Sequence, residues 1–207
     1  STTIQFRVSD AAGNIGPVSA QSITINAEAP GAPNLSLAAD TGSDTTDGLT
    51  NDGPVLAGGL VTGASWEYST DNGGRWTPGT GSSFELADGD YLAGDIQARQ
   101  IDGVGNVGEV GRIAIATTID TTPPAPLTIA LAGDSGASDS DGLTRDATVT
   151  VTGLESGASL EYSTDGGVNW TVGTGDSFEL EDGDYATGAI QARQVDGAGN
   201  VSGISSL

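Results

Sequence analysis

The sequence predicts an all-β protein made of tandem antiparallel β-sandwiches. Two observations carry this prediction. Short runs of alternating apolar and polar residues are separated by turn signals roughly every 8–12 residues, and no helical periodicity of useful length is present. A 42-residue segment also occurs twice without a gap, at 66–107 and 160–201, with 30 identical positions. The offset of 160 − 66 = 94 residues sets the length of one repeat unit.

The repeat is out of phase with the ends of the chain. A third, partial copy is marked by Gln5, Arg7 and the Asp10 to Asn14 turn, which match residues 97–106. We therefore expect residues 1–27 to be the last two strands of a preceding unit, 28–119 a complete unit, and 120–207 a second unit without its final strand. The Pro-rich linkers at 28–33 and 120–126 are short and stiff, which favours an elongated array.

Strands in the complete unit follow from its alternating runs. We expect seven, near residues 33–38, 54–60, 64–70, 75–77, 82–86, 92–101 and 107–117. Seven is the number typical of an immunoglobulin-like sandwich. Trp66 and Tyr68 alternate with polar residues, so their side chains should face the core.

Turns are marked by Asp and Gly. Asp71 and Asp165 each begin a short Gly-containing segment between two runs, as expected of hairpins. Tyr91 and Tyr185 each follow Asp-Gly-Asp at the start of a long predicted strand. In a sandwich, this is the position of a tyrosine corner, whose hydroxyl bonds back to the main chain.

Composition excludes several classes of function. The chain has 28 acidic and 6 basic residues, a net charge of −22, and neither Cys nor His. It can form no cysteine–histidine zinc site, thiol nucleophile or Ser-His-Asp triad, and we expect no enzyme. Its charge opposes binding to nucleic acid and to anionic lipid. No apolar run approaches the roughly 20 residues that span a bilayer, so no direct membrane insertion is expected.

Clusters of Asp predict a calcium site. The loop after the first strand of the complete unit contains Asp40, Asp44 and Asp47, and the same loop of the next unit contains Asp134, Asp139 and Asp141. Three carboxylates so close in sequence repel each other unless a cation lies between them. Ca²⁺ takes six to eight oxygen ligands, which carboxylates and loop carbonyls provide. A solvated acidic loop is the alternative.

Sandwich topology predicts further ligands at the junction between units. The first Asp loop should face the linker residue Asp120 and the next unit's turn from Asp196 to Asn200, forming one shared site. Asp102 and Asn106 are the corresponding turn residues of the complete unit. Local hydrogen bonds within such turns are the alternative to a metal role. In the earlier linker, we expect Glu28 to be the counterpart of Asp120.

The combination of motifs resembles bacterial immunoglobulin-like (BIg) repeats. It consists of the Asp-Thr-Thr-Pro-Pro-Ala-Pro linker, the Asp-Gly-Leu-Thr loop, the Glu-Tyr-Ser-Thr-Asp-Gly-Gly hairpin followed by Trp, and the Asp-x-x-Gly-Asn turn. Such repeats fill the extender regions of large type I-secreted RTX-type adhesins. The resemblance implies a spacer outside the cell, on the bacterial surface, with Ca²⁺ at its junctions and neighbouring repeats as partners, serving cell adhesion and biofilm formation.

Two other functions are open. A carbohydrate-binding module would use exposed aromatic side chains, for which Trp76 and Trp170 are the candidates, although we favour core or cross-strand packing for both rings. A self-assembling extracellular filament would form head to tail if the leading segment of one molecule completed the trailing unit of another by strand addition. The simpler interpretation of the repeat phase is a fragment of a longer array.

Overall fold

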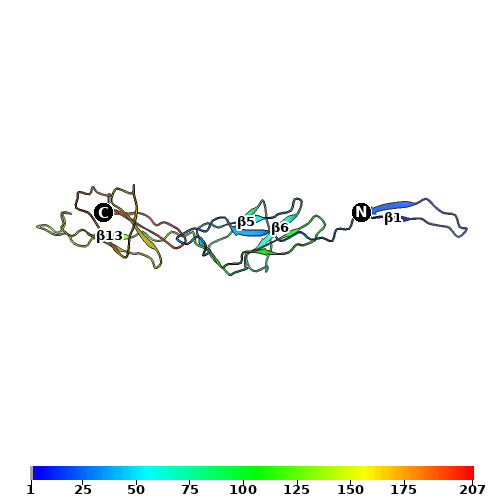
Figure 1. Cartoon of the computed structure of the whole chain (residues 1–207), viewed down its shortest axis with the longest axis horizontal. Helices are drawn as coiled ribbons and strands as arrows, with labels where there is room; N and C mark the ends of the chain where they lie inside the picture. The colour runs from blue at the N-terminus through cyan, green and yellow to red at the C-terminus, as the bar shows by residue number, and fades with distance from the viewer. Residues whose placement is uncertain (1) are drawn as a thin grey trace.

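The computed structural model describes residues 2–207, and every regular element among them is a β-strand. The all-β prediction is confirmed. Figure 1 shows an N-terminal hairpin, a first sandwich and a second sandwich following one another along the longest axis. The hairpin consists of β1 (Thr2–Phe6) and β2 (Ser19–Ile23), paired antiparallel with Thr2 opposite Ile23. All residues of both strands are exposed, since no other sheet within residues 2–207 covers them.

The first sandwich contains two main antiparallel sheets and one small sheet. One main sheet has the order β3 (Asn34–Leu37), β5 (Pro54–Gly58), β8 (Ser83–Glu85). The other has the order β11 (Gly111–Arg112), β10 (Gln97–Ile101), β6 (Ser65–Ser69), β7 (Thr77–Pro78). In the small sheet, β12 (Thr117–Ile119) pairs parallel with β4 (Leu49–Thr50) and antiparallel with β9 (Gly89–Tyr91).

Apolar side chains from both main sheets share one core. Val55 and Phe84 come from the first sheet, and Trp66 and Ala98 from the second, all at most 7% exposed. Tyr68 stacks on Phe84, with ring centroids 4.1 Å apart and an interplanar angle of 15°. Two sheets closed over a single core form a β-sandwich, and the predicted inward positions of Trp66 and Tyr68 are confirmed.

The second sandwich repeats the two main sheets. One has the order β13 (Thr128–Leu131), β14 (Thr148–Thr152), β17 (Ser177–Glu179). The other has the order β16 (Thr171–Val172), β15 (Ser159–Ser163), β18 (Gln191–Val195), β19 (Ser205–Ser206). Val149, Leu160, Phe178 and Ala192 fill its core, and Tyr162 stacks on Phe178 at 4.2 Å.

The first sandwich has ten short strands, β3 to β12, where we expected seven. The long strand expected at 92–101 is shortened to β10 because its first residues form a turn. The Asp95 carboxylate accepts the main-chain N–H of Leu92 at 2.9 Å, and Gly94 has a φ of 87°. The run expected at 107–117 is interrupted between β11 and β12, and neither β4 nor β9 was expected.

The tyrosine corner is confirmed in both sandwiches. The Tyr91 hydroxyl donates to the carbonyl of Ala87, and the Tyr185 hydroxyl donates to the carbonyl of Glu181, both at 2.9 Å. Desolvation by burial raises the pKa of Tyr91. Each phenol thereby fixes the segment that leads into β10 or β18.

Candidate functional site at the junction between repeats

The loop of residues 40–51 is held in shape by its own polar groups. Asp40 Oδ2 accepts the N–H of Gly48 at 3.0 Å, across the base of the loop. The fully buried Thr50 pairs its hydroxyl with that of Thr41 at 2.9 Å, and Thr41 Oγ1 lies 2.8 Å from Asn51 Oδ1. These bonds present Thr41 and Gly42 toward the second sandwich.

The turn from Asp196 to Asn200 is closed by its two end residues. Asp196 Oδ1 accepts the main-chain N–H of Asn200 at 2.8 Å, while Asn200 Nδ2 donates to Asp196 Oδ2 at 2.9 Å. The turns beginning at Asp10 and Asp102 have the same two bonds. All three copies are therefore complete local turns of the kind we named as the alternative to a metal role.

Hydrogen bonding within the turns also affects their acidity. At Asp102, desolvation works to raise the pKa, but the hydrogen bonds from Asn106, Val104 and Gly105 together outweigh it, so the pKa lies below its usual value. At Asp10 the pKa is lowered chiefly by the Asn14 side chain. Each bond favours the charged carboxylate, so both turns hold an anion near neutral pH.

Loop, turn and linker meet at the junction. Thr41 Oγ1 donates to the carbonyl of Ala198 at 2.7 Å. Gly42 lies so close to Gly197 that a β-carbon at residue 42 would overlap the Gly197 carbonyl oxygen. Asn200 Nδ2 donates to the main-chain carbonyl of Asp120 at 2.7 Å. The sequence predicted that these three segments face one another, and the contacts are made chiefly by neutral groups.

The acidic side chains of the loops do not converge. Within residues 2–207, no group of three His, Cys, Asp or Glu side chains is placed to hold a metal ion. Asp44 accepts bonds from Thr46, and Asp47 and Asp141 each accept the N–H two residues later. Asp139, like these three, is exposed.

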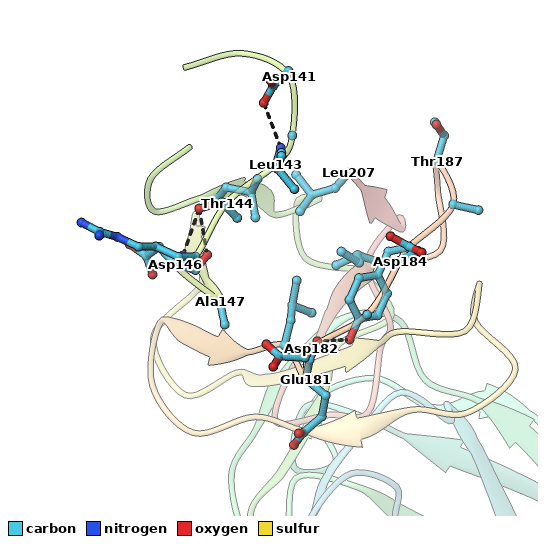
Figure 2. Close-up of a pocket in the computed structure, with 18 residues that line it drawn as sticks. Asp141, Leu143, Thr144, Asp146, Ala147, Glu181, Asp182, Asp184, Thr187 and Leu207 are labelled. Atoms are coloured by element: carbon cyan, nitrogen blue, oxygen red, sulfur yellow. Dashed lines mark hydrogen bonds between the residues drawn. The ribbon is translucent and has the colours of Figure 1, made fainter. Parts of the chain in front are cut away.

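Two carboxylate oxygens at the bases of the loops are buried, unlike the exposed carboxylates of the loop tips. Asp40 Oδ1 and Asp134 Oδ1 are buried and have no hydrogen-bond partner, while the second oxygen of each carboxylate accepts one main-chain N–H. A buried acceptor without a donor costs free energy unless a cation or water satisfies it. These two oxygens fit a cation ligand, whereas the carboxylates of Asp44, Asp47 and Asp141 accept hydrogen bonds from their own loops, as Figure 2 shows for Asp141.

The linker contact corrects one expectation. Asn106 Nδ2 donates to the carbonyl of Asn26 at 3.1 Å, as Asn200 does to that of Asp120. Asn26 Oδ1 also accepts the N–H of Glu28, as Asp120 Oδ1 accepts the N–H two residues after it. Asn26 is therefore the counterpart of Asp120, and the assignment to Glu28 was wrong. An amide replaces the carboxylate at this position of the earlier linker.

Two buried glutamines were missed by the sequence analysis. Gln100, 1% exposed, donates through Nε2 to the carbonyls of Gly31 and Gly59 at 2.9 and 3.2 Å, and its Oε1 accepts the N–H of Val61 at 2.6 Å. Gln194 makes the same three bonds in the second sandwich, to Ala125, Gly153 and Glu155. Each side chain ties the linker to its sandwich. The repeated Gln-Ala-Arg-Gln motif is the signal that could have identified them.

Trp76 and Trp170 pack across strands. The guanidinium carbon of Arg99 lies 4.0 Å from the ring centroid of Trp76, and Arg193 is placed in the same way over Trp170. Each Arg also bonds a Glu of the adjacent strand, such as Glu67 at 2.6 Å. One face of each indole is therefore occupied by a cation.

Several solved structures are similar to this chain. No family model matches the sequence, and no curated protein matches it. The crystal structure of the FN1–FN3 domains of chicken CNTN1 is similar over 98% of this chain and 75% of that chain, with 12% identity and a TM-score of 0.33. Within residues 2–207, no helix has the length and apolarity needed to cross a membrane.

Proposed function

We propose that the chain is a structural spacer of a large secreted bacterial surface protein, acting in cell adhesion and biofilm formation outside the cell. The observation that supports this most is the direct contact between the two sandwiches, in which Thr41 Oγ1 bonds the Ala198 carbonyl and Gly42 packs on Gly197. Such a contact restrains the second sandwich relative to the first. A spacer needs this restraint, because a loose joint would shorten its reach.

Burial at equivalent positions supports the same proposal. Ala198 is 1% exposed where the loop covers it, while Val104, its counterpart in the first sandwich, is 67% exposed. Leu49 is partly covered by Gly197, whereas its counterpart Leu143 is 75% exposed. The surfaces at the two ends of a sandwich are thus suited to contact a neighbouring unit.

Ca²⁺ is the cofactor in this proposal. One ion would be held at each loop base, by Asp40 in the first sandwich and by Asp134 in the second, whose Oδ1 atoms lack partners, with further oxygens from the loops and turns beside them. These ions would neutralise part of the −22 net charge that repels one unit from the next. At a free Ca²⁺ concentration of 100 times the Kd, binding at one site raises the free energy of unfolding by about 2.7 kcal/mol.

Thermal unfolding in millimolar Ca²⁺, in Mg²⁺ and in excess chelator tests the cofactor. We expect a higher melting temperature in Ca²⁺ alone, with a smaller rise in Asp40→Asn and Asp134→Asn. Asp71→Asn is the matched control, since its carboxylate belongs to a hairpin turn. Equal curves in all three solutions would remove Ca²⁺ from the proposal.

Small-angle X-ray scattering tests the spacer role separately. We expect a rod-like particle whose largest dimension stays constant with salt concentration. A collapsed or widely varying dimension in Ca²⁺ would contradict the spacer. The carbohydrate-binding alternative has less support, because Arg99 and Arg193 cover one face of each candidate Trp ring.

A further inference from the structure

The turn of residues 71–74 in the first sandwich contains the one Asn-Gly pair of the sequence, Asn72-Gly73. Asn72 is exposed and has a φ of 55°, and Gly73 has a φ of 84°. Two successive positive φ angles are typical of a type I′ turn, which the Asn-Gly pair favours. A main-chain hydrogen bond of 3.1 Å from Gly74 to the carbonyl of Asp71 closes the turn.

An Asn-Gly pair carries its own reactants for deamidation. The main-chain nitrogen of Gly73 attacks Cγ of the Asn72 side chain, a new N–Cγ bond closes a five-membered succinimide ring, and the side-chain amide leaves as ammonia with the proton of the attacking N–H. Water then opens the ring at either of its carbonyls, which leaves Asp or isoaspartate in place of Asn. Glycine favours this reaction because it has no β-carbon to hinder the approach. The exposed turn supplies the water, and no further reactant is needed.

Two buried side chains hold the reacting groups in the unreacted arrangement. Gln97, 5% exposed, donates from Nε2 to Asn72 Oδ1 at 2.6 Å. Ser69, 2% exposed, accepts the N–H of Gly73 through Oγ at 2.9 Å. Ser69 and Gln97 are opposite each other in the pairing of β6 with β10, so both anchors belong to one main sheet. Ring closure requires that the Gly73 nitrogen leave its hydrogen bond and that the Asn72 amide rotate toward it.

The second sandwich has the same anchors without the reactive side chain. Gly166 replaces Asn72, while Ser163 accepts the N–H of Gly167 at 2.9 Å. Gln191 has no side chain at position 166 to bond, and its Oε1 is buried without a partner. The serine anchor is therefore common to both hairpins, whereas the bond from glutamine to asparagine belongs to the sandwich that carries the reactive amide.

We propose that Asn72 is a deamidation site and that Gln97 keeps it unreacted while the turn is closed. The rate of modification then follows the fraction of molecules in which the turn is open, because ring closure needs the open form. Isoaspartate adds one carbon to the main chain, so the turn loses the 3.1 Å bond from the N–H of residue 72 to the carbonyl of Asp95. Only the first sandwich is altered in this way. The inference goes beyond the spacer function and requires no Ca²⁺.

Peptide mass spectrometry after incubation in mildly alkaline buffer with chelator tests the reaction. Deamidation replaces an amide by a carboxyl group, so the peptide that contains residue 72 gains mass, and an isoaspartate-specific methyltransferase detects the isoaspartate within it. We expect the folded chain to react at least about tenfold more slowly than the chain in urea, since ring closure requires the turn to open. Asn72→Gly, which copies the second sandwich, should show no mass gain in this peptide.

Gln97→Met tests the protecting bond. It removes the hydrogen bond to Asn72, so the folded variant should react about fivefold faster than the wild type, the equivalent of one hydrogen bond. Gln191→Met is the matched control, because it changes the equivalent position of the second sandwich and should leave the rate unchanged. Equal rates in the folded and urea-unfolded wild type would overturn the proposal, as would a rate in Gln97→Met no higher than in Gln191→Met. Since neither Ca²⁺ nor particle shape enters these measurements, failure of the spacer proposal would not alter them.

Discussion

The side-chain amide of Asn200 and the main-chain carbonyl of Asp120, 80 residues apart in sequence, are joined by a 2.7 Å hydrogen bond. Asn200 is only 7% exposed, and its amide also bonds Asp196. The corresponding bond in the first sandwich, from Asn106 to Asn26, is 3.1 Å long and more exposed. This bond connects the linker that leads into a sandwich with the turn that contacts the preceding one, so linker and turn are positioned together.

Replacing Asn200 by Ala should destabilise the second sandwich. The Asp120 carbonyl and the Asp196 carboxylate each lose a donor, and a partly buried acceptor left unsatisfied costs about 1–3 kcal/mol. Urea unfolding followed by the fluorescence of Trp170 measures this loss. Asn14→Ala is the control, because Asn14 makes the same bond to its own Asp but is exposed. An equal effect of both substitutions would show that the linker bond adds nothing.

Replacing Gly42 by Ala should open the junction. Gly42 has a φ of 93°, so Ala there is strained by roughly 1 kcal/mol and would also overlap the carbonyl of Gly197. Gly136, its counterpart in the second sandwich, has a φ of 138°, and a β-carbon there would lie 3.7 Å from its nearest neighbour, the Leu143 carbonyl oxygen. Gly136→Ala therefore carries backbone strain without the clash.

Small-angle X-ray scattering and NMR of Gly42→Ala and Gly136→Ala separate the clash at the junction from the backbone strain. Gly42→Ala should change the chemical shifts of Ala198 and Gly199 and broaden the distribution of the largest dimension, while Gly136→Ala should do neither. The two variants should lose similar stability from backbone strain. Unchanged shifts at residues 197–199 in Gly42→Ala would mean that the contact is not maintained in solution.

Gln194→Met should cost more stability than any surface substitution. Met is close to Gln in size but can replace none of the three hydrogen bonds to Ala125, Gly153 and Glu155. Gln194 is fully buried, and losing its three hydrogen bonds at about 1 kcal/mol each should cost about 3 kcal/mol. Gln5→Met, at an exposed position of the hairpin, should change stability by less than about 0.5 kcal/mol. Urea midpoints of the two variants give the comparison, and similar midpoints would refute the assigned role.

Features set by local sequence were predictable. Trp66 and Tyr68 alternate with polar residues, and Tyr91 follows a turn, so their roles could be read from a few neighbouring positions. The buried position of the Gln100 side chain could not be predicted in this way, because it depends on the carbonyls of Gly31 and Gly59, which only the fold brings together. The parallel pairing of β12 with β4 is non-local for the same reason.

The candidate site shows the same division. Topology alone predicted that loop 40–51 faces the turn at 196–200, since sandwich loops gather at defined ends. The atoms in contact were not predicted. The sequence pointed to the Asp side chains of the loop, whereas Thr41 and Gly42 make the contact with the turn. A carboxylate signals charge in the sequence, whereas a close approach of two glycines is visible only in three dimensions.

The Asp165 hairpin should respond to acid at unusually low pH. Its carboxylate accepts the main-chain N–H of Asn169 at 2.9 Å, the Asn169 side chain at 2.6 Å and the Ser163 hydroxyl at 2.7 Å. These bonds, the main-chain bond from Asn169 first, lower the pKa of Asp165 from 3.8 to about 2. A carboxyl whose pKa is depressed in the folded state stabilises that state above pH 3.8, and the contribution is lost as the pH falls toward 2.

Asn169→Ala removes the side-chain bond and keeps the main-chain one, so the pKa of Asp165 should rise toward its usual value and the acid-sensitive range should move up in pH. Carbon-13 NMR titration of the Asp carboxyl groups measures this directly. Asp71 is the internal reference, because the residue at the same turn position is Arg75, whose main-chain N–H is the first cause of the lowered pKa of Asp71. That pKa should not change in the variant. An Asp165 carboxyl that titrates identically in both proteins would show that the Asn169 amide does not hold it.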